Sequence, residues 1–400
     1  MHKARALGFS YENAEWANLG QGSPETGTLA GSPPRIEQLT INPMSHKYGP
    51  IAGQLELRQK VADFYNHIYR QDKESKYTYE NVSISGGGRI ALTRIVAALG
   101  NINLGHFLPD YTAYEELLST FRSFIPIPIL LSKSSKYHLS SAELKREIVG
   151  RGLNAILASN PCNPTGQLTE GQALAEWVQL ARECRCSLIL DEFYSHYIYT
   201  PRDNGKEGPK MVSAAAYVDD VNTDPVILID GLTKNWRYPG WRISWTVAPK
   251  EVIGLISSAG SFLDGGASNP FQEHIPDLLD PKRAKKEARA IQAEFGRKRR
   301  YVLRRLRAVG VEADAEPQGT FYVWANLANL PEPLNDGLRF FEEGLKEKVI
   351  TVPGSFFDVN PGRRRSSARY KSYARISFGP QIETIERGLD AIERVVKKFS

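Results

Sequence analysis

Between about residue 82 and residue 250, short runs rich in β-branched residues alternate with stretches of helical periodicity. This alternation is the strongest constraint on the fold, because strands separated by helices form βαβ units and a mostly parallel sheet. The pattern therefore predicts an α/β protein. The predicted strands are Val82–Ile84, His106–Leu108, Ile127–Leu131, Ala155–Ser159, Ser187–Leu190, Val226–Ile229 and Ile243–Ala248.

The rest of the chain predicts a second, smaller α+β domain. At 400 residues the chain is too long for one simple core, and two closely packed domains are expected. From about residue 285 onward, a long helical pattern precedes two strands, Thr320–Trp324 and Ala374–Phe378, and a closing helix over Ile382–Lys398. We expect a large domain over residues 46–284, and a small domain built from residues 1–45 and 285–400.

Composition and charge argue against several classes of protein. No apolar run is long enough to cross a bilayer, and the N-terminus has no apolar signal core, so we expect a cytoplasmic protein. The formal charge of +6 is mild for this length and does not indicate a nucleic-acid partner. Cys162, Cys184 and Cys186 are too few for a disulfide framework, and no second pair at matching spacing suggests a metal site.

Glycine and polar residues follow the first predicted strands, at the carboxyl ends where sheets of this kind bind ligands. Gly87, Gly88 and Arg89 open a helix after the first strand, and glycines there let backbone N–H groups approach a phosphate. A tight turn that requires glycine is the alternative explanation of this motif. Tyr111 follows the second strand, where it can stack on a planar ring or pack in the core.

Three later strand ends carry side chains that can bind a ligand or take part in a reaction. The loop after residue 159 contains two prolines and a glycine, which make it rigid and fix the direction of the Asn163 amide. Asp191 closes an apolar strand, where a carboxylate is costly unless it meets a cation or a donor. Lys234 follows another strand, where burial can make its amine nucleophilic. Arg242 lies eight residues later and can bind a phosphate through two hydrogen bonds.

The order and placement of these motifs together resemble the class I/II aminotransferases, which are fold-type I enzymes dependent on pyridoxal 5′-phosphate (PLP). The resemblance extends from about Leu19 to Phe378. It implies a three-layer PLP-dependent transferase fold, with a seven-stranded, mostly parallel sheet and a smaller α+β domain. It also implies a homodimer with shared active sites, and neither a nucleic-acid nor a membrane partner.

The resemblance implies a role for each candidate residue. Lys234 would hold PLP as a Schiff base and later shuttle protons, and Asp191 would keep the pyridine nitrogen protonated. Asn163 and Tyr194 match the residues that hydrogen-bond the phenolic oxygen of PLP, and Tyr111 matches the residue that stacks on its ring. The phosphate would be bound by Gly87, Gly88, Arg89, Thr233 and Arg242, and by Tyr48 reaching across from the neighbouring subunit.

Three residues are expected to contact the substrate. Gly22 lies in a segment that resembles the N-terminal loop of the family, whose glycine contacts the substrate carboxylate. Arg375 resembles the arginine that binds the α-carboxylate as a fork, and an arginine on an interior strand without such a partner would be costly. Asn163 is expected to contact the substrate as well as the cofactor.

Two positions depart from the pattern of the family. Many members carry a hydroxyl three residues before the Schiff-base lysine, where this chain has Gly231, so Thr233 supplies the phosphate contact instead or one contact is lost. In one branch, an arginine four residues before a Ser-Asn-Pro motif holds the distal carboxylate of aspartate, and Asp264 stands there in this chain. An acid there favours a basic or neutral donor over aspartate, whereas a simple turn is the alternative explanation.

The sequence therefore predicts a PLP-dependent aminotransferase that moves an α-amino group between an amino acid and a 2-oxo acid. PLP lyases share all the cofactor residues, so a carbon–sulfur lyase or an enzyme resembling aminocyclopropane-carboxylate synthase remains an alternative. A regulatory PLP-binding module fused to a DNA-binding domain is a weaker alternative, because too few residues precede the substrate loop to form such a domain. The identity of the amino donor is not encoded in these motifs.

Overall fold

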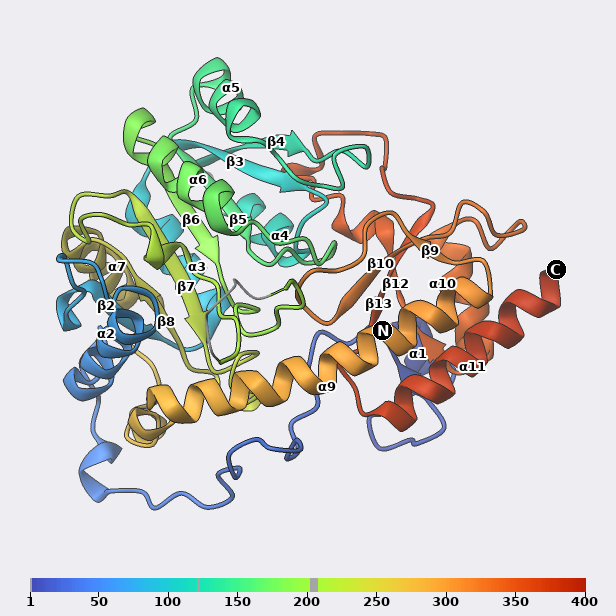
Figure 1. Cartoon of the computed structure of the whole chain (residues 1–400), viewed down its shortest axis with the longest axis horizontal. Coiled ribbons are helices and arrows are strands. Elements are labelled where there is room, and N and C mark those ends of the chain that lie inside the picture. The colour runs from blue at the N-terminus through green and yellow to red at the C-terminus, as the bar shows by residue number, and fades with distance from the viewer. Residues whose placement is uncertain (1, 121–122, 202–207) are drawn as a thin grey trace.

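The computed structural model describes residues 2–120, 123–201 and 208–400. Its principal sheet has seven strands in the order β2-β8-β7-β6-β5-β3-β4 (Figure 1). The strands are β2 (Val82–Ser85), β3 (Ile102–Leu108), β4 (Phe124–Leu130), β5 (Ala155–Ser159), β6 (Ser187–Asp191), β7 (Val226–Gly231) and β8 (Ser244–Val247).

The sheet is mostly parallel, which confirms the predicted fold class. In it, β8 runs antiparallel to both of its neighbours, β2 and β7, and the remaining neighbours pair in parallel. The carboxyl ends of β5, β6 and β7 therefore lie at the same edge. Ser159 at the end of β5 is the register partner of Asp191 at the end of β6, so the residues that follow these strands converge.

All seven predicted strands occur in this sheet, although two of them begin earlier than predicted. β3 begins at Ile102 rather than His106, because pairing with β4 extends the strand through Asn103 and Gly105, which are poor strand formers on their own. β4 begins at Phe124 and contains two prolines. It tolerates them because it is an edge strand that pairs on one side with β3.

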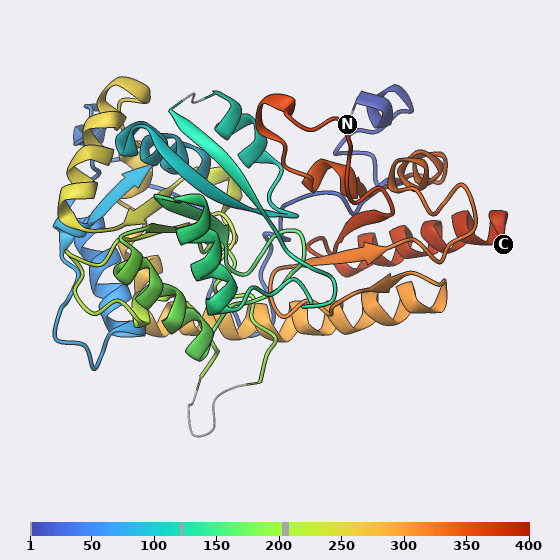
Figure 2. The same cartoon turned by 90° about the horizontal axis from the view of Figure 1, so that it is seen from above.

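Helices cover both faces of the sheet, which makes three layers (Figure 2). Alternate residues of the central strands belong to two separate apolar clusters, as expected for a strand buried on both faces. Leu157 and Ile189 pack with α3 (Gly88–Leu99), α4 (Ala113–Thr120) and α7 (Lys250–Leu263). Ile156 and Leu188 pack on the other face with α2 (Leu55–Tyr69), α5 (Ser141–Arg151) and α6 (Gly171–Cys184).

A smaller α+β part is built from both ends of the chain. Its four-stranded antiparallel sheet has the order β12-β13-β10-β9, and β1 pairs in parallel with β11 beside it. The long helix α9 (Pro281–Ala308) runs from the principal sheet to this part (Figure 1). The other elements are β1 (Ala17–Asn18), β9 (Glu312–Ala313), β10 (Tyr322–Asn326), β11 (Val349–Ile350), β12 (Val352–Pro353), β13 (Tyr373–Ser377), α1 (His2–Ala6), α8 (Asn269–Gln272), α10 (Gly337–Lys346) and α11 (Ile382–Phe399).

The predicted strands of the smaller part are confirmed as β10 and β13, which pair with each other. The two-residue strands β1, β9, β11 and β12 are too short to produce a period in the sequence, and they were not predicted. Across the described ranges, none of the helices combines the length and the apolar character that crossing a membrane requires.

Gly231, one of the two departures from the family pattern, has a steric explanation. It ends β7 beside β8, and a Cβ atom at this position would lie 2.6 Å from the Ile243 carbonyl oxygen and 2.6 Å from the Ser244 Cα. Because both are backbone atoms of a paired strand, a side chain here would force the two strands apart.

We therefore predict that Gly231→Ser lowers the free energy of unfolding by about 1–3 kcal/mol, the usual cost of overpacking. Urea unfolding followed by circular dichroism measures this change. Gly254→Ala is the matched control, because a Cβ on this helical glycine would meet no atom within 4 Å, and it should be neutral or slightly stabilising. A Gly231→Ser variant with the wild-type urea midpoint would contradict this steric explanation.

Candidate active site

A cavity of about 500 Å³ lies at the carboxyl edge of the principal sheet. Its wall includes Gly22 and Ser23 from the N-terminal segment and Tyr322 and Arg375 from the smaller sheet. The cavity therefore joins the two sheets and both chain ends. Among the residues predicted from the sequence, those that line it are Gly22, Gly88, Arg89, Tyr111, Asn163, Asp191, Tyr194, Thr233, Lys234, Arg242 and Arg375.

Lys234 is the amine of this cavity. Its Nζ donates a hydrogen bond to the backbone oxygen of Gly22. Burial lowers its pKa to about 7, and the positive charges of Arg375 and Arg242 act in the same direction, while Asp191 partly opposes them. A large fraction of this lysine is therefore a neutral, nucleophilic amine near pH 7, as the sequence interpretation requires.

Asp191 supplies a buried carboxylate to the wall of the cavity. It accepts hydrogen bonds from the hydroxyl of Tyr114 at 3.0 Å and from the Phe193 N–H at 3.4 Å. Burial raises its pKa to about 6, against the lowering effect of these donors and of Lys234. The carboxyl group is thus held in place and is poised to bind a cationic N–H.

The loop after β5 fixes Asn163, as its prolines predicted. The Cys162 N–H donates to the Gln167 carbonyl at 2.8 Å, and the Gly166 N–H returns to the Cys162 carbonyl at 2.7 Å. The Asn163 N–H donates to Ser159 Oγ at 3.1 Å. The amide of Asn163 is therefore directed into the cavity by a loop that is hydrogen-bonded to itself and to β5.

Arg375 meets Asn163 in the cavity. Its Nη1 donates to Asn163 Oδ1 at 2.9 Å, and its Nη2 donates to the Gly20 carbonyl at 2.9 Å. The guanidinium lies 4.1 Å from the ring centroid of Tyr322. Its buried Nε has no hydrogen-bond partner among the described residues, so the side chain keeps a donor for an anionic ligand.

A second group of donors lies at the start of α3. Gly87 has a φ of +99°, and a Cβ there would come within 2.1 Å of Arg242 Nη2, so glycine is required for the approach of this arginine. Arg89 Nη2 donates to the hydroxyl of Tyr111 at 3.3 Å. Because the free N–H groups of a helix N-terminus and two guanidinium groups meet here, the arrangement suits a phosphate.

Sequence reasoning missed two tyrosines. The Tyr322 hydroxyl lies 2.9 Å from that of Tyr194, and Tyr114 binds Asp191. Tyr322 stands on a strand that is buried on nearly all positions, so alternation gave no sign of which side chains face the cavity. Tyr114 lies in the first turn of α4, and no pattern in the sequence distinguishes it from an ordinary core tyrosine.

The cavity wall does not include three of the residues singled out for a ligand, Gly87, Tyr48 and Asp264. Tyr48 is 99% exposed, which is compatible with its expected role towards a neighbouring subunit. Asp264 is paired with the fully buried Arg94, whose Nε donates to Oδ2 at 2.7 Å. Burial alone would raise the pKa of Asp264, but Arg94 and the Gly266 N–H hold this pKa below its usual range. Its charge is compensated within this chain, so the structure supports the turn explanation.

Comparison with known proteins agrees with this geometry. The sequence model described as "Aminotransferase class I and II" matches residues 14–392, nearly the whole chain. The chain belongs to the class I and II aminotransferase family. Members of this family use PLP, and the relatives found are named as aminotransferases, so this chain is an aminotransferase rather than the lyase considered from the sequence.

Two relatives of this aminotransferase are distant but cover nearly its whole length. It is 25% identical to a "Probable aspartate/prephenate aminotransferase" of Aquifex aeolicus, over 99% of this chain and 95% of the relative. It is 26% identical to an "Aspartate aminotransferase" of Pyrococcus abyssi, over 95% and 92%. The structure of Thermus thermophilus aspartate aminotransferase with maleate has a TM-score of 0.79 at 22% identity, over 98% of this chain and 94% of the other, and shows the same fold.

The lowered pKa of Lys234 gives a testable pH dependence. The neutral amine is the reactive form, so labelling of Lys234 by an amine-specific reagent should rise as the pH increases through about 7. Brief labelling of the cofactor-free protein from pH 5 to 10, followed by peptide mass spectrometry, measures this. The exposed Lys60 serves as the internal reference. A Lys234 profile that coincides with that of Lys60 would show that burial does not lower its pKa.

Proposed function

We propose that this aminotransferase binds PLP covalently through Lys234 and moves an α-amino group from an amino acid to a 2-oxo acid. One observation carries the proposal. A single cavity contains an amine of lowered pKa, a buried carboxylate and three arginines, held by elements from both parts of the chain. Catalytic amines and carboxylates with shifted pKa values gather in this way at reactive centres.

The residues of the cavity fit PLP. Arg242, the N-terminus of α3 and Thr233 would hold the phosphate, with Arg89 beside them. Asp191 would bind the protonated ring nitrogen, and Tyr111, which lines the cavity, would stack on the ring. When bound, PLP supplies an electron-withdrawing ring that stabilises negative charge at the α-carbon of an attached amino acid.

The chain's own residues would guide and move the protons. Lys234 Nζ is able to take the proton from the substrate α-carbon, because its pKa of about 7 leaves much of it neutral. Burial holds the pKa of the Tyr194 hydroxyl well above its ordinary value, so this phenol stays protonated and can donate a hydrogen bond. Asn163 would donate beside it through its amide, whose oxygen is already bound by Arg375.

Arg375 would select substrates that carry an α-carboxylate. Its planar guanidinium is fixed by Asn163 and Gly20 and retains an unpaired Nε. Gly22 forms the wall nearby, and a Cβ there would lie 3.2 Å from the hydroxyl of Tyr322. The relatives are named for different substrates, which include aspartate, prephenate and a furan phosphate, so their names do not identify one donor. On the strength of Arg375, we propose α-amino acids and 2-oxo acids as the substrate class.

We also propose a homodimer with shared active sites. Ile41, Met44 and Tyr48 are large apolar residues with more than half of their surface exposed, and Phe262 is 75% exposed. The side-chain amide of Asn269 donates to the carbonyls of Ser45 and Lys47, which joins α8 to the segment that contains Tyr48. Large apolar side chains that are exposed in this way support a subunit interface, where Tyr48 would reach the phosphate of the other subunit.

We also propose a domain division and a location for this chain. The division into a large domain of residues 46–284 and a small domain of residues 1–45 and 285–400 is supported by the separation of the two sheets. A cytoplasmic location is supported by the three cysteines, all of which are free thiols.

The experiment that tests the function is an amino-transfer assay with defined products. The PLP-loaded protein is incubated with an amino acid and 2-oxoglutarate or pyruvate, and we expect the matching 2-oxo acid and a new amino acid in equal amounts. Amines that lack the α-carboxylate should be poor donors, because Arg375 would have no partner. Lys234→Ala should lower the rate by roughly 10²-fold or more. Release of ammonia without a new amino acid would instead identify a lyase.

A further inference from the structure

Arg237 follows the proposed cofactor lysine by three residues but takes no part in the cavity chemistry described above. It is completely buried and adopts a φ of +57°, a left-handed conformation that is costly for a residue other than glycine. Such a conformation persists where surrounding contacts fix it. The question is therefore what the contacts of Arg237 hold together.

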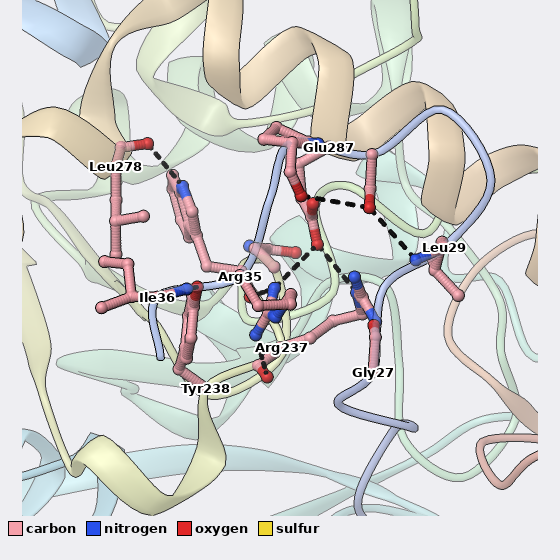
Figure 3. Close-up of polar contacts among 12 residues, drawn as sticks. Gly27, Leu29, Arg35, Ile36, Arg237, Tyr238, Leu278 and Glu287 are labelled. Carbon is pink, nitrogen blue, oxygen red and sulfur yellow. Dashed lines mark hydrogen bonds and ion pairs between the residues drawn. The ribbon is translucent and has the colours of Figure 1, made fainter. Parts of the chain in front are cut away.

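The side chain of Arg237 joins three parts of the chain (Figure 3). Its Nη1 donates to the Gly27 carbonyl at 2.6 Å and to the Glu25 carbonyl at 3.0 Å. Its Nε donates to Glu287 Oε1 of α9 at 2.7 Å. Glu287 thus neutralises the buried guanidinium, and Arg237 Nη1 binds the N-terminal segment, residues 20–36, while its Nη2 has no hydrogen-bond partner among the described residues.

Arg35 makes the reciprocal connection from the N-terminal segment to the lysine loop, residues 234–242. Its Nη2 donates to the Arg237 carbonyl at 2.8 Å, and its Nη1 donates to the Trp236 carbonyl at 3.0 Å (Figure 3). Its guanidinium lies 3.7 Å from the ring centroid of Tyr238. The Ile36 N–H donates to the Tyr238 hydroxyl at 3.0 Å. The two loops therefore exchange hydrogen bonds in both directions.

The same segment forms the wall of the cavity. Gly22 and Ser23 line the cavity, between Gly20, which binds Arg375, and Glu25, which binds Arg237. Lys298 of α9 is fully buried and binds both the Glu25 carboxylate and the Pro380 carbonyl. The wall residues are consequently held from both sides by charged donors of the protein itself.

We propose that Arg237 is a positioning residue that holds the N-terminal segment against the lysine loop, and so fixes the amino acid subsite formed by Gly22, Lys234 and Arg375. The inference rests on the proposed function. Arg237 binds the segment after the wall residues Gly22 and Ser23, whereas Arg375 binds it before them, at Gly20. Loss of Arg237 should therefore loosen the substrate wall and leave the residues proposed for the phosphate and the ring in place.

The test uses the PLP-loaded protein and two variants. Arg237→Lys keeps the charge beside Glu287 but cannot reach two carbonyls and a carboxylate as a fork. Arg237→Met with Glu287→Gln removes both charges of the ion pair, so no unpaired carboxylate remains buried beside the variant side chain. Because Glu287 Oε1 also lies 3.5 Å from Arg35 Nη1, Glu287→Gln alone is measured beside the double variant, and only the difference between the two is assigned to Arg237. Arg305→Gln is the matched control, because this arginine of α9 binds Asp390 and Glu393 of α11, away from the N-terminal segment.

Hydrogen–deuterium exchange of residues 20–36 is the first measurement. We expect exchange in the double variant to be faster by roughly tenfold or more, because two hydrogen bonds to a charged group are lost. Arg237→Lys should give an intermediate rate, and Arg305→Gln should match the wild type. Unchanged exchange in both Arg237 variants, or an equal increase in Arg305→Gln, would overturn the proposal.

The second measurement separates KM from kcat for the most active amino donor found in the transfer assay. KM should rise roughly tenfold in the double variant, with a smaller change in kcat and with the wild-type amount of bound PLP. A wild-type KM in both Arg237 variants would overturn the proposal. Hydrogen–deuterium exchange requires no turnover, and the proposed function is judged on the wild-type protein alone. Failure of this proposal is therefore distinguishable from failure of the proposed function.

Discussion

The burial of Lys234 among positive charges is the interaction on which the rest of this site depends. An ammonium group enclosed with Arg242 and Arg375 is disfavoured, and its pKa falls to about 7. The protein can maintain this arrangement because each arginine is anchored separately: Arg375 binds Asn163 and Gly20, and Arg242 binds the Pro239 carbonyl beside Gly87. The Asp191 carboxylate opposes the charges of Lys234, Arg242 and Arg375, but burial raises the pKa of Asp191 as well. The cavity therefore keeps an excess of positive charge, which suits a ligand that carries a phosphate and a carboxylate.

The architecture explains why these groups can be held so close. Asp191 and Lys234 follow adjacent parallel strands, and Asn163 follows the next strand, so one edge of the principal sheet supplies three of the groups. The fourth, Arg375, stands on β13 of the smaller sheet, and Gly22 belongs to the N-terminal segment. The site therefore requires both parts of the chain, and the buried contacts of Arg237 and Lys298 give the N-terminal segment a defined position between them.

Much of this could be predicted from the sequence because the signals are local. Strand runs, glycines and polar residues at strand ends identified the sheet edge and several residues of the cavity wall. The resemblance to the family added Gly22, Tyr194, Thr233 and Arg375, which brings the predicted residues that line the cavity to eleven. What could not be predicted depends on tertiary contact. The two-residue strands have no period, and the burial of β10 on nearly every position hides that Tyr322 lines the cavity, with its hydroxyl 2.9 Å from that of Tyr194. The sequence suggested that Asp264 could bind a substrate, because no local pattern indicates its ion pair with Arg94, which lies 170 residues away along the chain.

The central claim is that Lys234 is the residue that binds PLP, and reduction of the PLP-loaded protein with borohydride tests it most directly. Borohydride makes a lysine–PLP bond permanent, and proteolysis with mass spectrometry then identifies the modified lysine. The account predicts one labelled peptide, which contains Thr233, Lys234 and Asn235. Labelling that is suppressed by pre-incubation with an amino acid would accompany this result. A label on any other lysine, or no stable label after loading with PLP, would contradict the account.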